Sequence, residues 1–491
     1  MKRIFRLPSV TLLPYWLIVV IVFVFIVRIP SFVEPFYYGD EMIYLDLGEG
    51  VRRGMTLYKD VHDNKPPLLY YLAAIAGNVF TFRVILALWM MATTILFWHF
   101  CRALFKSNRS AIASTVCFAV LTSLPFFEGH IANAELFMIA PTVGAFYLIW
   151  KNNSLVRAFA AGVLIAIAAL FKIPSIFDAG VIVGLWIFAL QPNKKSIRLF
   201  LTKSICFGLG IALPMTITFV WYALKGSFSE YLTAAFLQNF GYVNTWRGQA
   251  TAQVPFLVKN GPILLRGIVV LAIGIVLFFT KRRRSTVFVL GCLWVATSLF
   301  AATLSERPYP HYFVQLLPSF SLLLGLLFTD ETKEQALVIF PLTLLFFVPV
   351  YFGFWNYSTS HYVRRFQTYV NSGFSLEYLN EFGDHTNRNY EVANYIKTRT
   401  GINDRVFVWG DSSAIYALSN RLPPIKYVAD YHIRDFSSVE ETLSALRKAP
   451  PAMVVILSEA ALPEELLSFT EEMYTEIHRM NGAAVWYNTK Q

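Results

Sequence analysis

The sequence predicts a polytopic α-helical membrane protein that ends in a small α/β domain. Of its 491 residues, 56% are hydrophobic and only 15% are charged, a balance typical of membrane proteins and rare in soluble ones. The apolar residues form runs long enough, or nearly long enough, to cross a bilayer, and they predict about eleven spans. These runs lie near residues 11–29, 82–104, 110–126, 134–150, 156–172, 174–190, 200–224, 261–280, 286–304, 311–329 and 336–354.

The charged residues predict the orientation of the spans. The net charge of +11 comes from short basic clusters such as Lys281–Arg284, which the positive-inside rule places in the cytoplasm. With a cytoplasmic N-terminus, all twelve acidic residues before Asp330 fall in outer loops or at the outer ends of spans. Only the acidic inner connection at Asp330 and Glu331 fits poorly. An odd number of spans then places the region after about residue 355 outside. Because the basic residues lie between spans, we expect no nucleic-acid partner.

The N-terminus is expected to be an uncleaved first span. Lys2, Arg3 and Arg6 precede the first apolar run as in a signal peptide, but that run is long enough to cross a bilayer and no small-residue cleavage site follows. All four cysteines lie in or beside predicted spans and lack metal-ligand spacing, so we expect free thiols.

Two outer loops are long enough to hold a site. The first, residues 30–81, contains the apolar piece Pro66–Leu72, which is too short to cross and is expected to lie in or dip into the interface. The second, about 225–260, is rich in aromatic residues, Asn and Gln. Its composition suits a sugar-binding surface, a contact with lipid headgroups or a lid.

The composition becomes that of a soluble domain from about residue 385. Alternating patterns predict strands at 405–409, 425–428, 452–457 and 483–487, and helices at 391–400, 412–419, 439–448 and 464–480. We therefore divide the chain into a membrane domain, residues 1–355, and an extracytoplasmic linker with a small α/β domain, residues 356–491. Asp411 follows a strand, where ligands often bind, although a helix N-cap is the more frequent role of such a residue. Neither G-x-G-x-x-G nor a P-loop occurs.

The predicted topology brings a group of carboxylates and cations to the outer face of the membrane. Carboxylates at a membrane boundary are costly to keep there, which suggests a function. The group comprises Asp40, Glu41, His62, Asp63 and Lys65 of the first loop, Glu128, His130, Asn133 and Glu135 after the third span, Lys172, Arg307 and His311. Such a set suits transfer from a phosphate leaving group to a hydroxyl, because cations hold the phosphate and a carboxylate accepts the proton.

Each member of this group also has a structural explanation. Asp40 and Glu41 are in the right place to cap the helix that follows them, and capping alone would explain their presence. Lys65 before Pro66 and Pro67 is consistent with a rigid corner carrying a snorkelling lysine. His311, beside three aromatic residues, is consistent with a hydrogen-bonding role in an interfacial aromatic belt. Lys172 is harder to explain structurally, because both its flanks are apolar.

The motifs that carry these residues resemble those of a known family. They are the run Gly39–Tyr44, the Gly54-x-x-x-Tyr58-x-Asp60 spacing, Asp63–Leu68, Arg83, Asn133-Ala134-Glu135, Phe171–Pro174 and Arg307–Phe313 with Pro318. Together they resemble GT-C fold glycosyltransferases, in particular the bacterial dolichyl-phosphate-mannose protein mannosyltransferase-like family (glycosyltransferase family 39 and relatives), which includes lipid A aminoarabinose transferase. The match extends over most of the membrane region.

This resemblance implies an inverting hexosyl- or pentosyltransferase in a bacterial plasma membrane, with a polyprenyl-phosphate-linked sugar as donor and a hydroxyl acceptor. It implies Asp40 as the catalytic base and Glu41 as its acidic neighbour. The donor phosphate would be held by Lys65, Lys172, Arg307 and His311, with Asp63, Glu135, Tyr58 and Arg83 in support. Family members differ in whether they use a divalent metal, and this sequence has no unambiguous metal site.

Three other functions are consistent with parts of the pattern. A transporter or lipid-linked sugar flippase would line a path with the same charges, but it predicts charges at the bilayer midplane and paired inverted repeats. An inactive GT-C scaffold would not need both Asp40 and Lys65. A polymerase or ligase that uses a pyrophosphate-linked glycan remains an alternative within the enzymes. The sequence does not identify the sugar or the acceptor.

Overall fold

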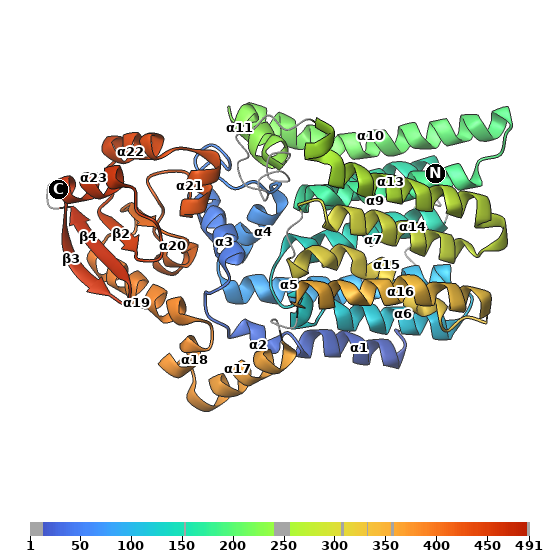
Figure 1. Cartoon of the computed structure of the whole chain (residues 1–491), viewed down its shortest axis with the longest axis horizontal. Coiled ribbons are helices and arrows are strands. Elements are labelled where there is room, and N and C mark those ends of the chain that lie inside the picture. The colour runs from blue at the N-terminus through green and yellow to red at the C-terminus, as the bar shows by residue number, and fades with distance from the viewer. Residues whose placement is uncertain are drawn as a thin grey trace, which may run out of the picture.

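The computed structural model describes residues 13–151, 154–239, 256–305, 309–330, 332–354 and 358–488. A bundle of roughly parallel and antiparallel helices forms one end of the molecule and a small α/β domain forms the other, with the helices of the first outer loop between them (Figure 1). The bundle contains α1 (Tyr15–Ile26), α2 (Ile29–Phe32), α5 (Val79–Leu104), α6 (Asn108–Leu121), α7 (Ala134–Lys151), α8 (Leu155–Phe171), α9 (Asp178–Ala189), α10 (Lys194–Leu224), α13 (Phe256–Thr280), α14 (Thr286–Ala302), α15 (Leu317–Leu326) and α16 (Thr332–Phe352).

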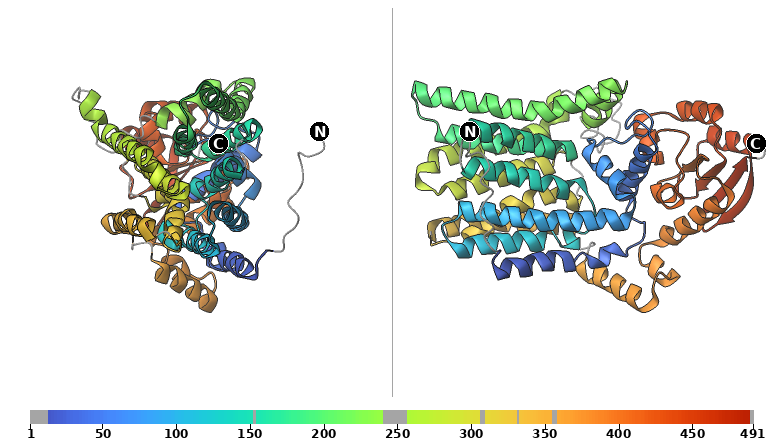
Figure 2. Two further views of the ribbon diagram at one scale, coloured as in Figure 1. Left: turned by 90° about the vertical axis from the view of Figure 1, so that its right-hand side faces the viewer. Right: turned by 180° about the vertical axis from the view of Figure 1, so that it is seen from behind.

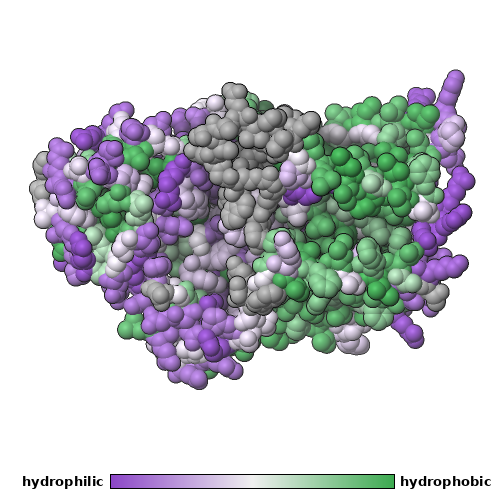
Figure 3. Space-filling view, viewed as in Figure 1, coloured by the Kyte–Doolittle hydropathy of each residue, from purple (hydrophilic) through white to green (hydrophobic). Residues whose placement is uncertain are grey.

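The helix bundle has the length and polarity of a multi-pass membrane domain. Five helical segments of the described chain are long and apolar enough to cross a membrane: 15–32, 79–104, 194–224, 260–283 and 333–352. Four shorter apolar helices, at 108–121, 155–171, 173–189 and 286–302, pack among them. Apolar side chains cover the outside of the bundle, whereas the α/β domain is mainly hydrophilic (Figure 3). The total of about eleven spans stays a prediction.

Two glycines let α8 and α10 approach at backbone distance. A Cβ added to Gly162 on α8 would lie 2.1 Å from the Phe207 carbonyl oxygen, and one added to Gly210 on α10 would lie 2.1 Å from the Phe159 carbonyl oxygen. Small residues at such crossings are a common way to pack helices tightly in membranes. The view from behind shows α10 lying along the edge of the bundle (Figure 2).

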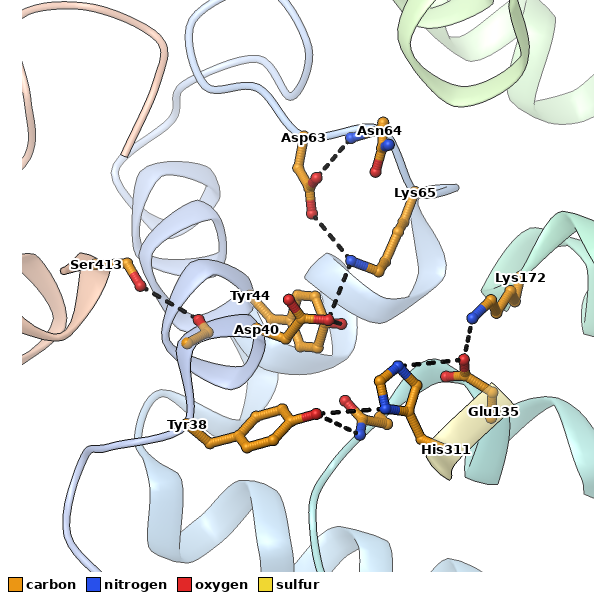
Figure 4. Close-up of polar contacts among 12 residues, drawn as sticks. Tyr38, Asp40, Tyr44, Asp63, Asn64, Lys65, Glu135, Lys172, His311 and Ser413 are labelled. Carbon is orange, nitrogen blue, oxygen red and sulfur yellow. Dashed lines mark hydrogen bonds and ion pairs between the residues drawn. The ribbon is translucent and has the colours of Figure 1, made fainter. Parts of the chain in front are cut away.

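The first outer loop folds into two helices that lie between the bundle and the α/β domain. Helix α3 (Gly39–Arg52) starts directly after the extended Tyr38, so Asp40 and Glu41 occupy its first turn. The predicted interfacial piece lies at the start of α4 (Leu68–Ala76), which ends at the left-handed Gly77 with a φ of 72°. A segment of short helical turns, η5 (Pro310–Leu316), lies in the second half of the chain. It carries His311 toward the first turn of α3 (Figure 4).

The α/β domain contains a four-stranded sheet in the order β1-β2-β4-β3. Strands β1 (Val406–Trp409) and β2 (Met453–Leu457) are parallel and fully buried, as their continuous apolar sequences predict, and β3 (Tyr474–Met480) and β4 (Ala483–Asn488) are antiparallel. The helices are α17 (Thr359–Ser372), α18 (Leu376–Asn380), α19 (Asp384–Arg399), α20 (Ser413–Ser419), α21 (Asp430–Phe436), α22 (Val439–Lys448) and α23 (Glu464–Met473).

Two sequence predictions for this domain were wrong. The predicted helix 464–480 ends at Met473, and its second half forms β3, because pairing with β4 outweighs the local helical pattern. The predicted strand 425–428 is not part of the sheet. Its Lys426 carbonyl instead accepts a hydrogen bond of 2.8 Å from the His62 amide, which ties this segment to the first outer loop.

The close crossing of α8 and α10 can be tested with two alanine variants of one helix. Gly210→Ala should lower the free energy of unfolding by about 1–3 kcal/mol, because the new methyl group meets backbone that must move. The matched control is Gly208→Ala, where an added Cβ meets nothing within 4 Å, so unfolding should change little or shift upward. Thermal unfolding of the detergent-solubilised protein measures both, and equal behaviour of the two variants would contradict the packing argument.

Candidate active site

A polar cleft of about 520 Å³ opens where the first outer loop, η5 and the α/β domain meet. Asp40 lines it from the first turn of α3, and Lys65 reaches into it from the corner before Pro66 (Figure 4). The remaining wall is formed by Tyr38, Gly39, Asp63, Asn64, Glu128, Tyr309, His311, Tyr312, Asp411, Tyr431, His432, Asp435 and Phe436. Four parts of the chain that are far apart in the sequence therefore build a single cleft, since Glu128 belongs to none of the other three.

Asp40 is held in its ionised form at the edge of this cleft. Its Oδ2 accepts a hydrogen bond of 2.9 Å from the Tyr44 hydroxyl and lies 3.4 Å from Lys65 Nζ. Burial raises the pKa of Asp40, but the Lys65 ammonium and His311 outweigh burial and lower that pKa below its ordinary value. The positive end of the α3 dipole acts in the same direction. The side chain is still 31% exposed, so a substrate can reach it.

The corner that carries Lys65 is fixed from behind by two buried tyrosines. Tyr58 donates a hydrogen bond of 2.8 Å to the Lys65 carbonyl, and the Tyr70 hydroxyl donates one of 2.7 Å to Asp63 Oδ2. Lys65 Nζ lies 3.7 Å from that same Asp63 oxygen. Burial raises the pKa of Asp63, but Lys65 and His432 outweigh it, and the resulting pKa is about 2. Asp63 is therefore a permanent anion that orients the lysine.

A second group of charges lies across the cleft on η5 and the ends of the bundle helices. His311 Nδ1 is 2.6 Å from Glu128 Oε2, to which the Tyr38 hydroxyl also donates a hydrogen bond of 2.6 Å. His311 Nε2 is 3.8 Å from Glu135 Oε1, and Lys172 forms an ion pair with the same oxygen. The Lys172 ammonium lies 3.7 Å from the centre of the Tyr312 ring.

Each of these two groups of charges includes a residue with an unusual, left-handed backbone conformation. Tyr58 has a φ of 73° and Glu128 a φ of 56°. Both values lie in the left-handed region, which residues other than glycine rarely adopt. Each such residue costs of order 1–3 kcal/mol, which the surrounding contacts must offset. Two of the four described non-glycine residues with a positive φ, Tyr58 and Glu128, are therefore residues that support Lys65 and His311.

Glu41 points away from the cleft, into the bundle. Its Oε2 lies 2.6 Å from Arg83 Nη2, and its Oε1 accepts a hydrogen bond of 2.9 Å from the Ala132 amide. Arg83 also pairs with Glu34 at 3.0 Å, and all three charged side chains are buried. The structure therefore places Glu41 and Arg83 in a separate buried cluster, whereas it brings Asp40, Asp63, Lys65, Glu135, Lys172 and His311 together. Arg307 lies outside the described residues, as do residues 240–247 of the second outer loop.

Sequence reasoning did not assign a role to several residues that line the cleft or contact its lining. Tyr44 follows Asp40 by four residues, a helical spacing that was a usable signal for their contact. Asp411 was noticed for its place after a strand, and the N-cap position of α20 is in fact occupied by Ser412, while Asp411 lines the cleft. His432 and Asp435 lie on α21, which the sequence did not predict. Within the described residues, no group of three or more His, Cys, Asp or Glu side chains is placed to hold a metal ion.

Two solved structures match this chain, and the first of them supports the fold. The structure of ArnT from Cupriavidus metallidurans bound to undecaprenyl phosphate matches with a TM-score of 0.59 at 14% identity, covering 97% of this chain and 98% of that one. The oligosaccharyltransferase of Archaeoglobus fulgidus tethered to an acceptor peptide containing the NVT sequon matches with a TM-score of 0.48 at 12% identity, covering 97% of this chain and 74% of that one.

Sequence comparisons reach only the C-terminal part. Residues 386–490, from α19 to β4, match the family described as the C-terminal domain of the competence-induced protein Ccs4 (Ccs4_C). No curated protein matches the sequence. The likeness to ArnT extends over nearly the whole chain, and the chain has the GT-C fold that its motifs predicted.

The buried position of Glu41 predicts a large effect of its neutralisation on stability. Glu41→Gln should lower the free energy of unfolding by about 3–5 kcal/mol, because it leaves the buried Arg83 guanidinium undercompensated. Glu49→Gln on the same helix should change it by less than about 1 kcal/mol, because Glu49 pairs with the partly exposed Arg52 and Arg53. Thermal unfolding in detergent compares the two, and a Glu41→Gln protein as stable as its control would contradict the assignment.

Proposed function

We propose that the protein is an inverting glycosyltransferase that moves a sugar from a polyprenyl-phosphate donor to a hydroxyl acceptor. The observation that carries the proposal is the arrangement of Asp40. It is an ionised, partly exposed carboxylate held by Lys65 and Tyr44, and it faces a cleft whose other side carries His311. The ArnT structure, which has the same fold, contains undecaprenyl phosphate, and this supports a polyprenyl-phosphate donor here.

In this proposal Asp40 acts as the general base. It accepts the proton of the acceptor hydroxyl while that oxygen forms a bond to the anomeric carbon of the sugar. The bond between the anomeric carbon and the phosphate oxygen breaks on the opposite face, and its electron pair stays on the phosphate. A single displacement of this kind inverts the anomeric configuration. Tyr44 and Lys65 orient the carboxylate and keep it ionised until the hydroxyl arrives.

The departing phosphate requires positive charge rather than a general acid, because a phosphodiester-type leaving group is a weak base. His311 on the far side of the cleft and Lys172 beside it are the proposed cations, and both lie against Glu135. A donor phosphate would share or replace that carboxylate as their partner. Arg307 precedes η5 in the sequence by three residues and is a further proposed phosphate ligand.

The remaining predicted site residues act as positioning residues. Glu41 and Arg83 anchor the first turn of α3, and through it Asp40, to the bundle. Tyr58 and Asp63 hold the corner from which Lys65 extends. None of these four side chains needs to touch the reacting atoms.

We also propose that the cleft faces outward from a bacterial plasma membrane. The end of the bundle opposite the α/β domain carries hydrophilic residues (Figure 3) and includes the basic turn Lys281–Arg283. A cytoplasmic location of that end follows the positive-inside rule. About eleven spans, a cytoplasmic N-terminus, a membrane domain of residues 1–355 and an extracytoplasmic α/β domain within 356–491 are consistent with this orientation.

Replacement of Asp40 tests the proposed base. Asp40→Asn should reduce transfer by about 10²–10⁴-fold and leave thermal unfolding nearly unchanged, because a general base contributes that much and the side chain is partly exposed. The assay follows release of undecaprenyl phosphate from a panel of undecaprenyl-phosphate sugars by the purified full-length protein. Glu49→Gln is the control, since Glu49 lies outside the cleft on the same helix. Normal turnover by Asp40→Asn would overturn the assignment, and sugar translocation without release would favour a flippase.

Replacement of Lys65 should change the pH dependence of the transfer activity. Lys65 lowers the pKa of Asp40, so Lys65→Met should raise that pKa and move the acid limb of the kcat profile to higher pH. Activity would then be lost at a pH where the unaltered protein still works. Lys59→Met, in the same loop but outside the cleft, should leave the limb in place. An unmoved acid limb in Lys65→Met would show that the lysine does not control ionisation of the base.

A further inference from the structure

The α/β domain forms one wall of the cleft that Asp40 lines. The wall consists of Asp411 after β1 and of Tyr431, His432, Asp435 and Phe436 on α21. It thus uses the edge of the sheet at the carboxyl ends of the parallel strands, where ligands of α/β domains usually bind.

This wall is fixed to the first outer loop rather than loosely apposed to it. The Ser413 hydroxyl donates a hydrogen bond of 3.2 Å to the Gly39 carbonyl, one residue before Asp40 (Figure 4). The His62 amide donates one of 2.8 Å to the Lys426 carbonyl. His432 Nε2 lies 3.6 Å from Asp63 Oδ1. A substrate that reaches Asp40 therefore has to lie against the α/β domain.

His432 is a buried residue of this wall with one ring nitrogen that has no hydrogen-bond partner among the described residues. The residue is 4% exposed, and its Nδ1 has no hydrogen-bond partner among the described residues. Burial lowers the pKa of His432, although Asp63 acts against it, so the ring is neutral at pH 7. With Nε2 facing the Asp63 carboxylate, the proton of the neutral ring lies on Nε2 and Nδ1 is left as an acceptor.

The other charged groups of the wall also accept hydrogen bonds. Asp411 and Asp435 are carboxylates, which only accept when ionised. Burial, and then the nearby Asp430 and Asp40 carboxylates, raise the pKa of Asp411 to about 6, which still leaves it mostly ionised at pH 7.

Among its described lining residues, the cleft carries more carboxylates than lysine or arginine side chains. Five carboxylates line it, and the only lysine or arginine among its described lining residues is Lys65. Lys65 already lies between Asp40 and Asp63. An anionic group next to the attacking hydroxyl would therefore be repelled, whereas hydroxyl and ammonium groups would find acceptors.

We propose that the Asp411–His432–Asp435 wall is the acceptor subsite and that it selects an acceptor rich in hydrogen-bond donors. A sugar unit bearing an ammonium is preferred to its neutral analogue, and one bearing a phosphate is excluded. The name acceptor subsite rests on the proposed transfer. The preference among sugars is a property of binding, and it can be measured without a donor.

The test compares three matched sugars on the purified full-length protein in detergent: glucosamine, glucose and glucose 6-phosphate. Saturation-transfer NMR titrations at pH 7.5 and low salt should give about five-fold tighter binding of glucosamine than of glucose. With undecaprenyl phosphate present to occupy the proposed donor side, glucose 6-phosphate should bind at least about ten-fold more weakly than glucose, because only the carboxylates of the α/β wall then face it. Glucose 6-phosphate binding as tightly as glucose would overturn the proposal.

Variants assign the preference to the wall. Asp411→Asn should remove the advantage of glucosamine while retaining glucose binding, because the amide keeps an acceptor oxygen but loses the charge. Asp404→Asn is the matched control at the start of β1, where Asp404 bonds the Gly401 amide outside the cleft, and it should keep the full preference. A preference that survives Asp411→Asn would overturn the assignment. Release of undecaprenyl phosphate is measured separately, so failed transfer with an intact sugar preference would refute only the proposed transfer.

Discussion

The site depends on one buried guanidinium. Arg83 on α5 is 0% exposed and is enclosed by Glu41, Glu34 and the Ser31 carbonyl. A buried charge is tolerated only when its partners are present, so this cluster fixes the first turn of α3 against the bundle. Successive residues on a helix point about 100° apart. Because Glu41 is held inward, its neighbour Asp40 is directed outward into the cleft, and the orientation of the proposed base follows from the pair behind it.

The cleft itself is arranged as a set of mutually neutralised charges. Lys65 lies between two carboxylates, and Lys172 and His311 lie against Glu135. This arrangement keeps each charge compensated at a boundary where unpaired charge is costly. Under the proposed function, a donor phosphate would replace Glu135 as the partner of Lys172 and His311, and donor binding would be coupled to a rearrangement of that carboxylate.

The sequence was informative where the pattern is local and uninformative where it is not. Hydropathy and charge predicted Asp40, Lys65, Lys172 and His311 on one face. In the structure Asp40, Lys65 and His311 line a single cleft, and Lys172 lies beside it, paired with Glu135 (Figure 4). Nothing local distinguished Asp40 from Glu41, because their separation depends on the partner Arg83 on another helix.

The same limit applies to the α/β domain. The second half of segment 464–480 becomes a strand only through its pairing with β4, and the position of His432 depends on the docking of α21 against the first loop. The strands β1 and β2 were predictable because their apolar runs are continuous and end at turn residues. What could not be predicted was which edge of that sheet would meet the membrane domain.

The hydrogen bond between Ser413 and Gly39 joins residues that lie 374 positions apart in the sequence. The loop that carries the proposed base is made early, and the wall that completes the cleft is made last. The polypeptide therefore has no finished cleft during most of its synthesis, and the side of α3 that the α/β domain covers stays exposed until the end. Under the proposed function, a product of interrupted translation would lack one wall of its active site and would be inactive.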